Sequence, residues 1–149
     1  MSLDQNLISS LEHLVTIGVD GEEGYQKAAE MVSNKNLLAQ FEQLSTARNI
    51  QAEAIRNYLA DNGVEKPEHE GGFGGALHRA WLDIKGTLSN RSDSVSISSC
   101  LTGDEAAVKA YQAVLDEPNV PADLQKLLSE HLEDLKTDVQ NLEVTAKES

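Results

Sequence analysis

The chain has 149 residues, of which 40% are hydrophobic and 25% are charged, so it is long enough to fold around one apolar core. Its 25 acidic residues against 12 Lys and Arg give a net charge of -13, which argues against nucleic acid or an anionic membrane surface as a partner. No segment has the length and apolarity of a membrane span or a signal peptide. With one cysteine, we expect a cytoplasmic protein without an internal disulfide.

The first helix is expected at about 3–32, because apolar side chains recur there every three or four positions. Gly18, Gly21 and Gly24 lie inside this segment, and each glycine costs roughly 1 kcal/mol in a helix relative to alanine. They indicate either a break or a place where another part of the chain comes close. The apolar pattern keeps its phase on both sides of the glycines, which favours one continuous helix.

A second helix is expected at about 35–62, antiparallel to the first because only a short polar turn separates them. The apolar members of its buried face are Leu37, Phe41, Leu44, Ile55 and Tyr58. The same spacing, continued through the middle of the helix, falls on Arg48 and Gln51. A buried guanidinium and a buried amide need partners inside the fold, because an unpaired polar group in the core costs free energy.

Three further helices are expected, a short one at about 75–89 and two long ones at about 93–116 and 121–145. The connection of about 30 residues that holds the short helix is long enough to run the length of a bundle. The long helices on either side of it should therefore be parallel. The sequence predicts an all-α four-helix bundle with a ferritin-like crossover, in a single domain over 1–149.

Polar side chains from all four long helices reach one level near the middle of this bundle, at a rise of ~1.5 Å per residue. The side chains predicted to form this polar layer are Arg48, Gln51, Asp104, His131, Tyr25, Tyr111 and Asp138. In a structural interpretation, Arg48 and Asp104 form a buried ion pair whose remaining hydrogen bonds come from the other members.

A metal centre is the alternative interpretation. Glu22, Asp104, His131 and Asp134 are the side chains that can bind iron or manganese from facing helices. Metal sites in such bundles use Glu-x-x-His, and none of the four histidines has a glutamate three residues before it. Arg48 also places a fixed positive charge where a second metal would lie. The pattern therefore favours the structural layer, without a cofactor.

Three segments in chain order carry a resemblance to a known family: Asp20-Gly21 followed by Tyr25, Gly75-Ala76-Leu77-His78-Arg79-x-Trp81, and Cys100-x-x-Gly103-Asp104-Glu105 followed by Tyr111. They resemble a family of uncharacterised bacterial proteins, a domain of unknown function within the ferritin-like superfamily. The resemblance implies a ferritin-like bundle and no particular reaction. Some ferritin-like relatives bind iron, and the positions to which this property would carry over are Glu22, Asp104 and His131.

We therefore expect a non-enzymatic protein that acts through its surface or by self-association. The alternative is a ferritin-like metal protein with a storage role or a metal-dependent oxidoreductase activity. Apolar side chains that the bundle core does not need lie on the first two helices at Ile8, Val15, Leu38 and Ile50. Exposed apolar ridges of this kind indicate a homodimer.

Overall fold

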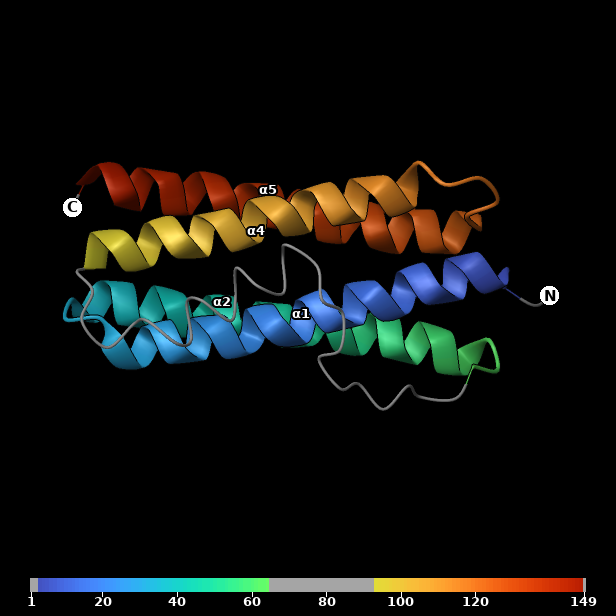
Figure 1. Ribbon diagram of the computed structural model, residues 1–149, viewed down its shortest axis with the longest axis horizontal. Helices are drawn as coiled ribbons and strands as arrows, with labels where there is room; N and C mark the ends of the chain where they lie inside the picture. The colour runs from blue at the N-terminus through green and yellow to red at the C-terminus, as the bar shows by residue number, and fades with distance from the viewer. Residues whose placement is uncertain (1–2, 65–92, 149) are drawn as a thin grey trace.

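The computed structural model describes residues 3–64 and 93–148, and these residues form four long α-helices and no strand (Figure 1). The helices are α1 (Gln5–Met31), α2 (Lys35–Asp61), α4 (Asp93–Leu115) and α5 (Ala122–Glu148). The predicted all-α, four-helix class is confirmed, and none of these helices is long and apolar enough to span a membrane. The short helix predicted at about 75–89 falls outside the described residues.

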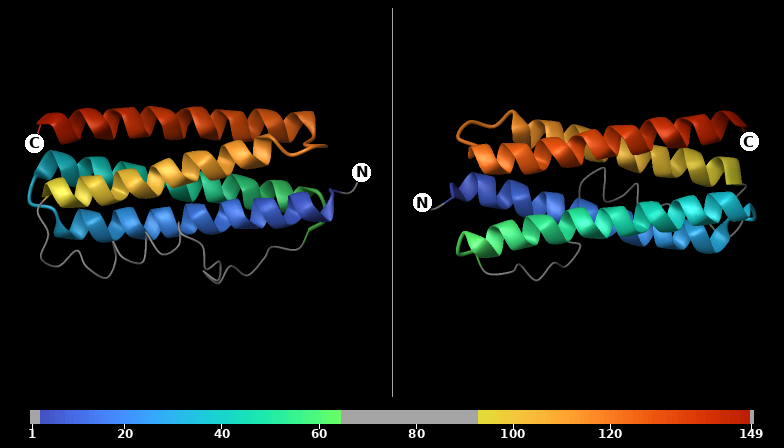
Figure 2. Two further views of the ribbon diagram at one scale, coloured as in Figure 1. Left: turned by 45° about the horizontal axis from the view of Figure 1, so that its top comes forward. Right: turned by 180° about the vertical axis from the view of Figure 1, so that it is seen from behind.

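The four helices form two antiparallel pairs, α1 with α2 and α4 with α5, and α2 and α4 run in the same direction (Figures 1 and 2). One local contact marks this arrangement. The carboxylate of Asp93, at the start of α4, accepts from the backbone N–H groups of Ser33 (3.0 Å) and Asn34 (3.2 Å) in the α1–α2 turn. The amide oxygen of Asn34 also caps α2, accepting from the N–H groups of Asn36 and Leu37.

The apolar interior consists of two groups of side chains. One group lies toward the α4–α5 turn and includes Leu11, Ile55 and Leu128. The other lies toward the α1–α2 turn and includes Phe41 and Leu142. The predicted polar positions of α2 fall between the two groups, so the charged side chains of the interior lie midway along the bundle.

Helix α1 is continuous through its glycines, and Gly18 and Gly21 lie where α2 comes close. A Cβ atom on Gly18 would lie 2.9 Å from the Cβ atom of Ala52 and 3.3 Å from the carbonyl oxygen of Arg48. A Cβ atom on Gly21 would lie 3.3 Å from Cγ of Arg48. The glycines therefore let the two helices approach each other and make room for the Arg48 side chain.

The apolar ridge predicted on the first two helices differs from the observed surface. Val15 is fully buried, so its assignment to an exposed ridge is wrong. Ile8 and Leu38 are partly buried against the two apolar groups, and Ile50 alone of the four is largely exposed, at 61%. The first two helices therefore do not present the predicted dimer surface.

We predict that Gly18→Ala lowers the free energy of unfolding by up to about 2 kcal/mol, because overpacking against Ala52, at about 1–3 kcal/mol, outweighs the roughly 1 kcal/mol gained in helix propensity. Urea denaturation measures this loss. Ala52→Gly, introduced into the Gly18→Ala variant, should recover part of the loss, giving a coupling energy of at least about 0.5 kcal/mol. A Gly18→Ala protein more stable than the wild type would contradict the close approach.

A buried ion-pair layer as the candidate functional site

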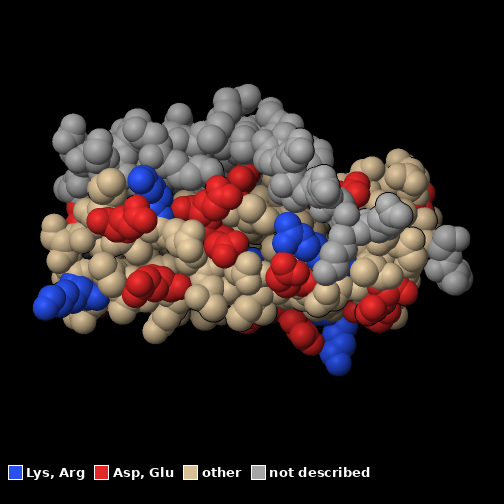
Figure 3. Space-filling model, turned by 90° about the horizontal axis from the view of Figure 1, so that it is seen from below, with Lys and Arg blue, Asp and Glu red and all other residues tan. Residues whose placement is uncertain are grey.

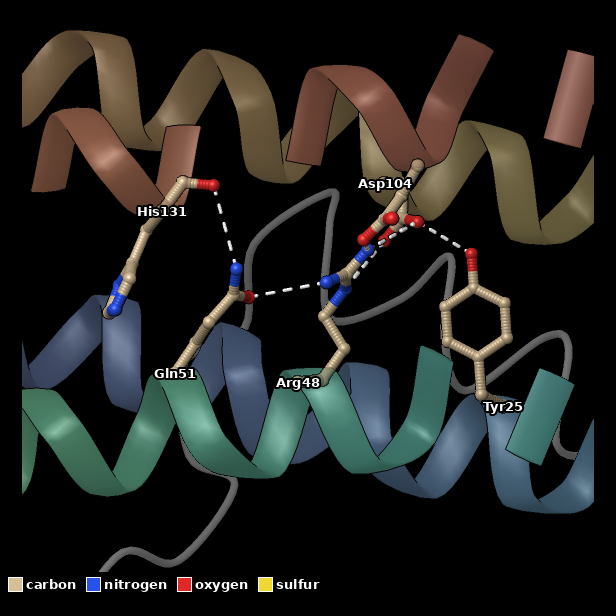
Figure 4. A network of polar contacts seen from close by, with 6 residues as sticks. Tyr25, Arg48, Gln51, Asp104 and His131 are labelled. Atoms are coloured by element: carbon tan, nitrogen blue, oxygen red, sulfur yellow. Dashed lines mark hydrogen bonds and ion pairs between the residues drawn. The ribbon is translucent and has the colours of Figure 1, made fainter. Parts of the chain in front are cut away.

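Arg48 and Asp104 form a bidentate ion pair in the middle of the bundle (Figure 4). Nε of Arg48 donates to Oδ1 of Asp104 over 3.2 Å, and Nη2 donates to Oδ2 over 3.0 Å. Asp104 is fully buried and Arg48 is 2% exposed. This geometry is the strong form of an ion pair, because two parallel hydrogen bonds accompany the attraction between the charges. The predicted buried pair is thus present.

Side chains from α1 and α5, together with Gln51 of α2, complete the hydrogen bonds of this pair. The Tyr25 hydroxyl, on α1, donates to Oδ2 of Asp104 over 2.5 Å. Nη2 of Arg48 also donates to Oδ2 of Asp138, on α5, over 3.0 Å. Nη1 donates to Oε1 of Gln51 over 3.2 Å. One guanidinium and its carboxylate therefore connect all four helices at one level.

His131 and Tyr111 extend the layer along α5 and α4. The Gln51 amide donates to the backbone carbonyl of His131 over 3.5 Å, and the Tyr111 hydroxyl lies 3.1 Å from Nδ1 of the His131 ring. In Figure 4 the His131 ring points away from Asp104. His131 therefore joins the layer through its carbonyl group and its bond to Tyr111, and not as a second partner of the carboxylate.

Burial and charge shift the pKa values in opposite ways within the layer. Burial disfavours the charged guanidinium of Arg48, but Asp104 and the other acidic groups outweigh it, so the pKa of Arg48 is raised. Burial, reinforced by Asp104, raises the pKa of Tyr25, which keeps the phenol protonated as a donor. Burial raises the pKa of Asp138 against the opposing effect of Arg48. Burial lowers the pKa of His131, so its ring is neutral at pH 7.

A groove of about 370 Å³ between α2 and α5 leads from the surface to the edge of this layer. Gln51, His131 and Asp138 line its inner side, and Ile50 and Asp134 lie at its exposed rim. The Asp138 side chain is 24% exposed, so its charge is partly solvated. The Arg48–Asp104 pair lies deeper, out of contact with solvent.

The four predicted metal ligands do not come together. Asp104 and His131 belong to the layer, whereas Asp134 is exposed. Glu22 is half-buried, and its carboxylate accepts from the Asn49 amide over 3.2 Å. Residues 3–64 and 93–148 contain no group of three or more His, Cys, Asp or Glu side chains arranged to hold a metal ion.

Two further buried polar groups lie on α1 and α4. Cys100 is fully buried, and burial, together with Asp104, raises the pKa of its thiol, so the thiol is the inert core residue that its inward position predicts. Asp20 is 4% exposed, and the sequence interpretation did not place it. Its position next to Gly21, off the apolar line of the helix, offered no signal of burial.

Fold and site together define an all-α four-helix protein whose core is crossed by a buried arginine–aspartate layer. Residues 6–117 match the family described as "Domain of unknown function (DUF2383)", and the chain belongs to this family. The match spans α1, α2 and α4 and so includes Tyr25, Arg48 and Asp104. No curated protein matches the chain.

We predict that Arg48→Met lowers the free energy of unfolding by roughly 3–5 kcal/mol, because it leaves Asp104 as a buried charge without its cation. Adding Asp104→Leu should recover much of this loss, since the pair is then replaced by apolar groups. Arg56→Met is the matched control on the same helix, because the ion pair that Arg56 forms in the described part of the chain is with Glu53, one turn away and partly exposed. Its loss should cost less than about 1 kcal/mol. Equal effects of the two single changes in chemical denaturation would contradict a buried pair.

The lowered pKa of His131 predicts a loss of stability in mild acid. The unfolded chain binds a proton near the ordinary pKa of 6.5, while the folded ring resists it, so stability falls as pH decreases below about 6.5. His131→Gln removes at most one proton from the difference in proton binding between the unfolded and the folded chain. The dependence of the unfolding free energy on pH should therefore become shallower by at most about 1.4 kcal/mol per pH unit. Denaturation between pH 5 and pH 8 tests this prediction. An unchanged slope would show that His131 titrates normally in the folded protein.

Proposed function

We propose that the protein is a non-catalytic, ferritin-like bundle protein of the cytoplasm, in which the polar layer takes the place of a metal centre and acts structurally. The single observation that carries this proposal is the bidentate contact of Arg48 with Asp104. A ferritin-like assignment is supported by the two antiparallel pairs of helices, in which α2 and α4 run parallel.

The contacts of Asp104 argue for replacement of a metal. Its two carboxylate oxygens already accept three hydrogen bonds, two from Arg48 and one from Tyr25. A metal ligand must present a free oxygen lone pair to the ion, and a cation next to Arg48 would meet a permanent positive charge. The contacts of the Asp104 carboxylate are therefore those of an ion pair and not those of a metal ligand.

A structural role follows from the position of the layer between the two apolar groups. Leucine-rich faces can slide past one another at small cost, since apolar contacts are not directional. Shifting α2 against α4 by one turn, about 5.4 Å, would leave Arg48 and Asp104 as unpaired buried charges. The layer thus specifies one alignment of the helices, as a buried polar residue specifies register in a coiled coil. We infer that the biological activity lies on the outer surface.

We predict that protein purified without a metal-affinity tag holds iron and manganese well below one ion per chain in elemental analysis, because the carboxylate of the layer is already paired. Asp104→Asn and His131→Gln should leave these low contents unchanged. Stoichiometric iron or manganese that disappears in these variants would instead identify a ferritin-like metal protein and overturn the proposal.

A further inference from the structure

A second groove, of about 340 Å³, lies on the molecular surface between α4 and α5. Its apolar lining comes from Val108 and Val139, which are only half-buried. Its charged lining comes from Glu105, Lys109, Lys136 and Glu143. None of these four charged side chains takes part in an ion pair among the described residues. The groove therefore offers an apolar strip with unpaired charges of both signs along its sides.

This balance of charge is unusual for a chain with a net charge of -13. Acidic side chains, with some Lys and Arg among them, are spread along the side of the molecule on which α1 and α2 lie (Figure 3). The charged lining of the α2–α5 groove consists of Glu130, Asp134 and Asp138, without a lysine or arginine. Two copies that met through the α2–α5 groove would therefore repel each other. The lining of the α4–α5 groove, with two glutamates and two lysines, instead offers opposite charges to a second copy of this chain.

The register of α4 and α5 places these charges in self-complementary positions. Asp104 and Asp138 both reach Arg48, so they mark one level of the antiparallel pair. We counted along each helix from Asp104 and Asp138 at a rise of ~1.5 Å per residue. On this count, Glu105 of α4 and Lys136 of α5 differ in level by about one residue.

By the same count, Lys109 on α4 and Glu133 on α5 lie at one level, about one turn along the bundle from Glu105 and Lys136. Glu133 is exposed and precedes Lys136 by about one turn of α5. Two pairs of opposite charge thus lie side by side, with one member of each pair on each helix.

We propose that the α4–α5 face is the interface of a homodimer in which a second copy of the chain packs against it around a two-fold axis parallel to the helices. Such an axis exchanges α4 and α5 across the interface. Glu105 of each copy then faces Lys136 of the other, and Lys109 faces Glu133. By the same count, Val108 lies between the two charged pairs, and Val139 lies just beyond the Glu105–Lys136 pair, so apolar and charged contacts alternate along the interface.

The size of this face suits a dimer. Helix α4 has 23 residues, a length of about 35 Å, and two packed helices present a face about 20 Å wide. The resulting area of about 700 Å² per copy is close to the roughly 800 Å² of a standard interface. The inference is independent of the proposed structural role of the polar layer, because it concerns the outer face of α4 and α5.

Sedimentation equilibrium of the full-length protein at physiological salt tests the proposal. The wild type should be a dimer. Lys136→Glu should weaken dimerisation at least about tenfold, because Glu105 of each copy would then face a glutamate of the other copy, once on each side of the two-fold axis. Adding Glu105→Lys to that variant exchanges the two charges and should restore dimerisation to within about threefold of the wild type, because the exchanged pair is still complementary. Far-UV circular dichroism checks that each variant is folded.

Lys35→Glu is the matched control, because it makes the same change of net charge at the exposed start of α2. It should leave the dissociation constant within about twofold of the wild-type value, since long-range effects of one exposed charge are screened by salt. A wild-type protein that is monomeric at every concentration would overturn the proposal. So would a dimer that responds equally to Lys35→Glu and Lys136→Glu. Neither result would change the outcome of the metal analysis, so the two proposals fail independently.

Discussion

The ion pair between Arg48 and Asp104 is the contact on which the alignment of the bundle depends. It joins α2 to α4 between the two apolar groups of the core, and either partner alone would be a buried charge without compensation. The helices must therefore stay where both side chains reach each other. The alignment of α1 and α5 is constrained in the same way, because Tyr25 of α1 donates to Asp104 and Asp138 of α5 accepts from Arg48.

The neighbouring residues are adapted to this contact. Gly21 leaves room on α1 for the aliphatic part of Arg48, and Gly18 lets α2 come close enough for the arginine to cross the core. Arg48 also lies over the ring of Tyr25, with 5.9 Å between Cζ and the ring centroid, which adds a cation–π contact to the hydrogen bonds. The glycines cost helix propensity, and the buried network compensates for that cost.

Much of this arrangement could be predicted from the sequence, because helical spacing shows which face of a helix is buried. It predicted the inward positions of Arg48 and Asp104 and the level at which they meet. It could not decide the flanking positions, since a rotation of a few tens of degrees moves such a residue between core and solvent at ~100° per residue. Asp134 accordingly faces solvent. Val15 is buried although a single apolar stripe predicts it on the outside, because α1 is buried on more than one side.

We propose that Arg48 takes the place that a metal ion would have in the middle of this bundle. Crystals grown with iron or manganese, measured at the absorption edge of the metal, test it most directly. We expect a bidentate Arg48–Asp104 contact and no anomalous peak within coordination distance of Asp104. An anomalous peak between Asp104 and Asp138, with the Arg48 side chain turned away, would contradict it.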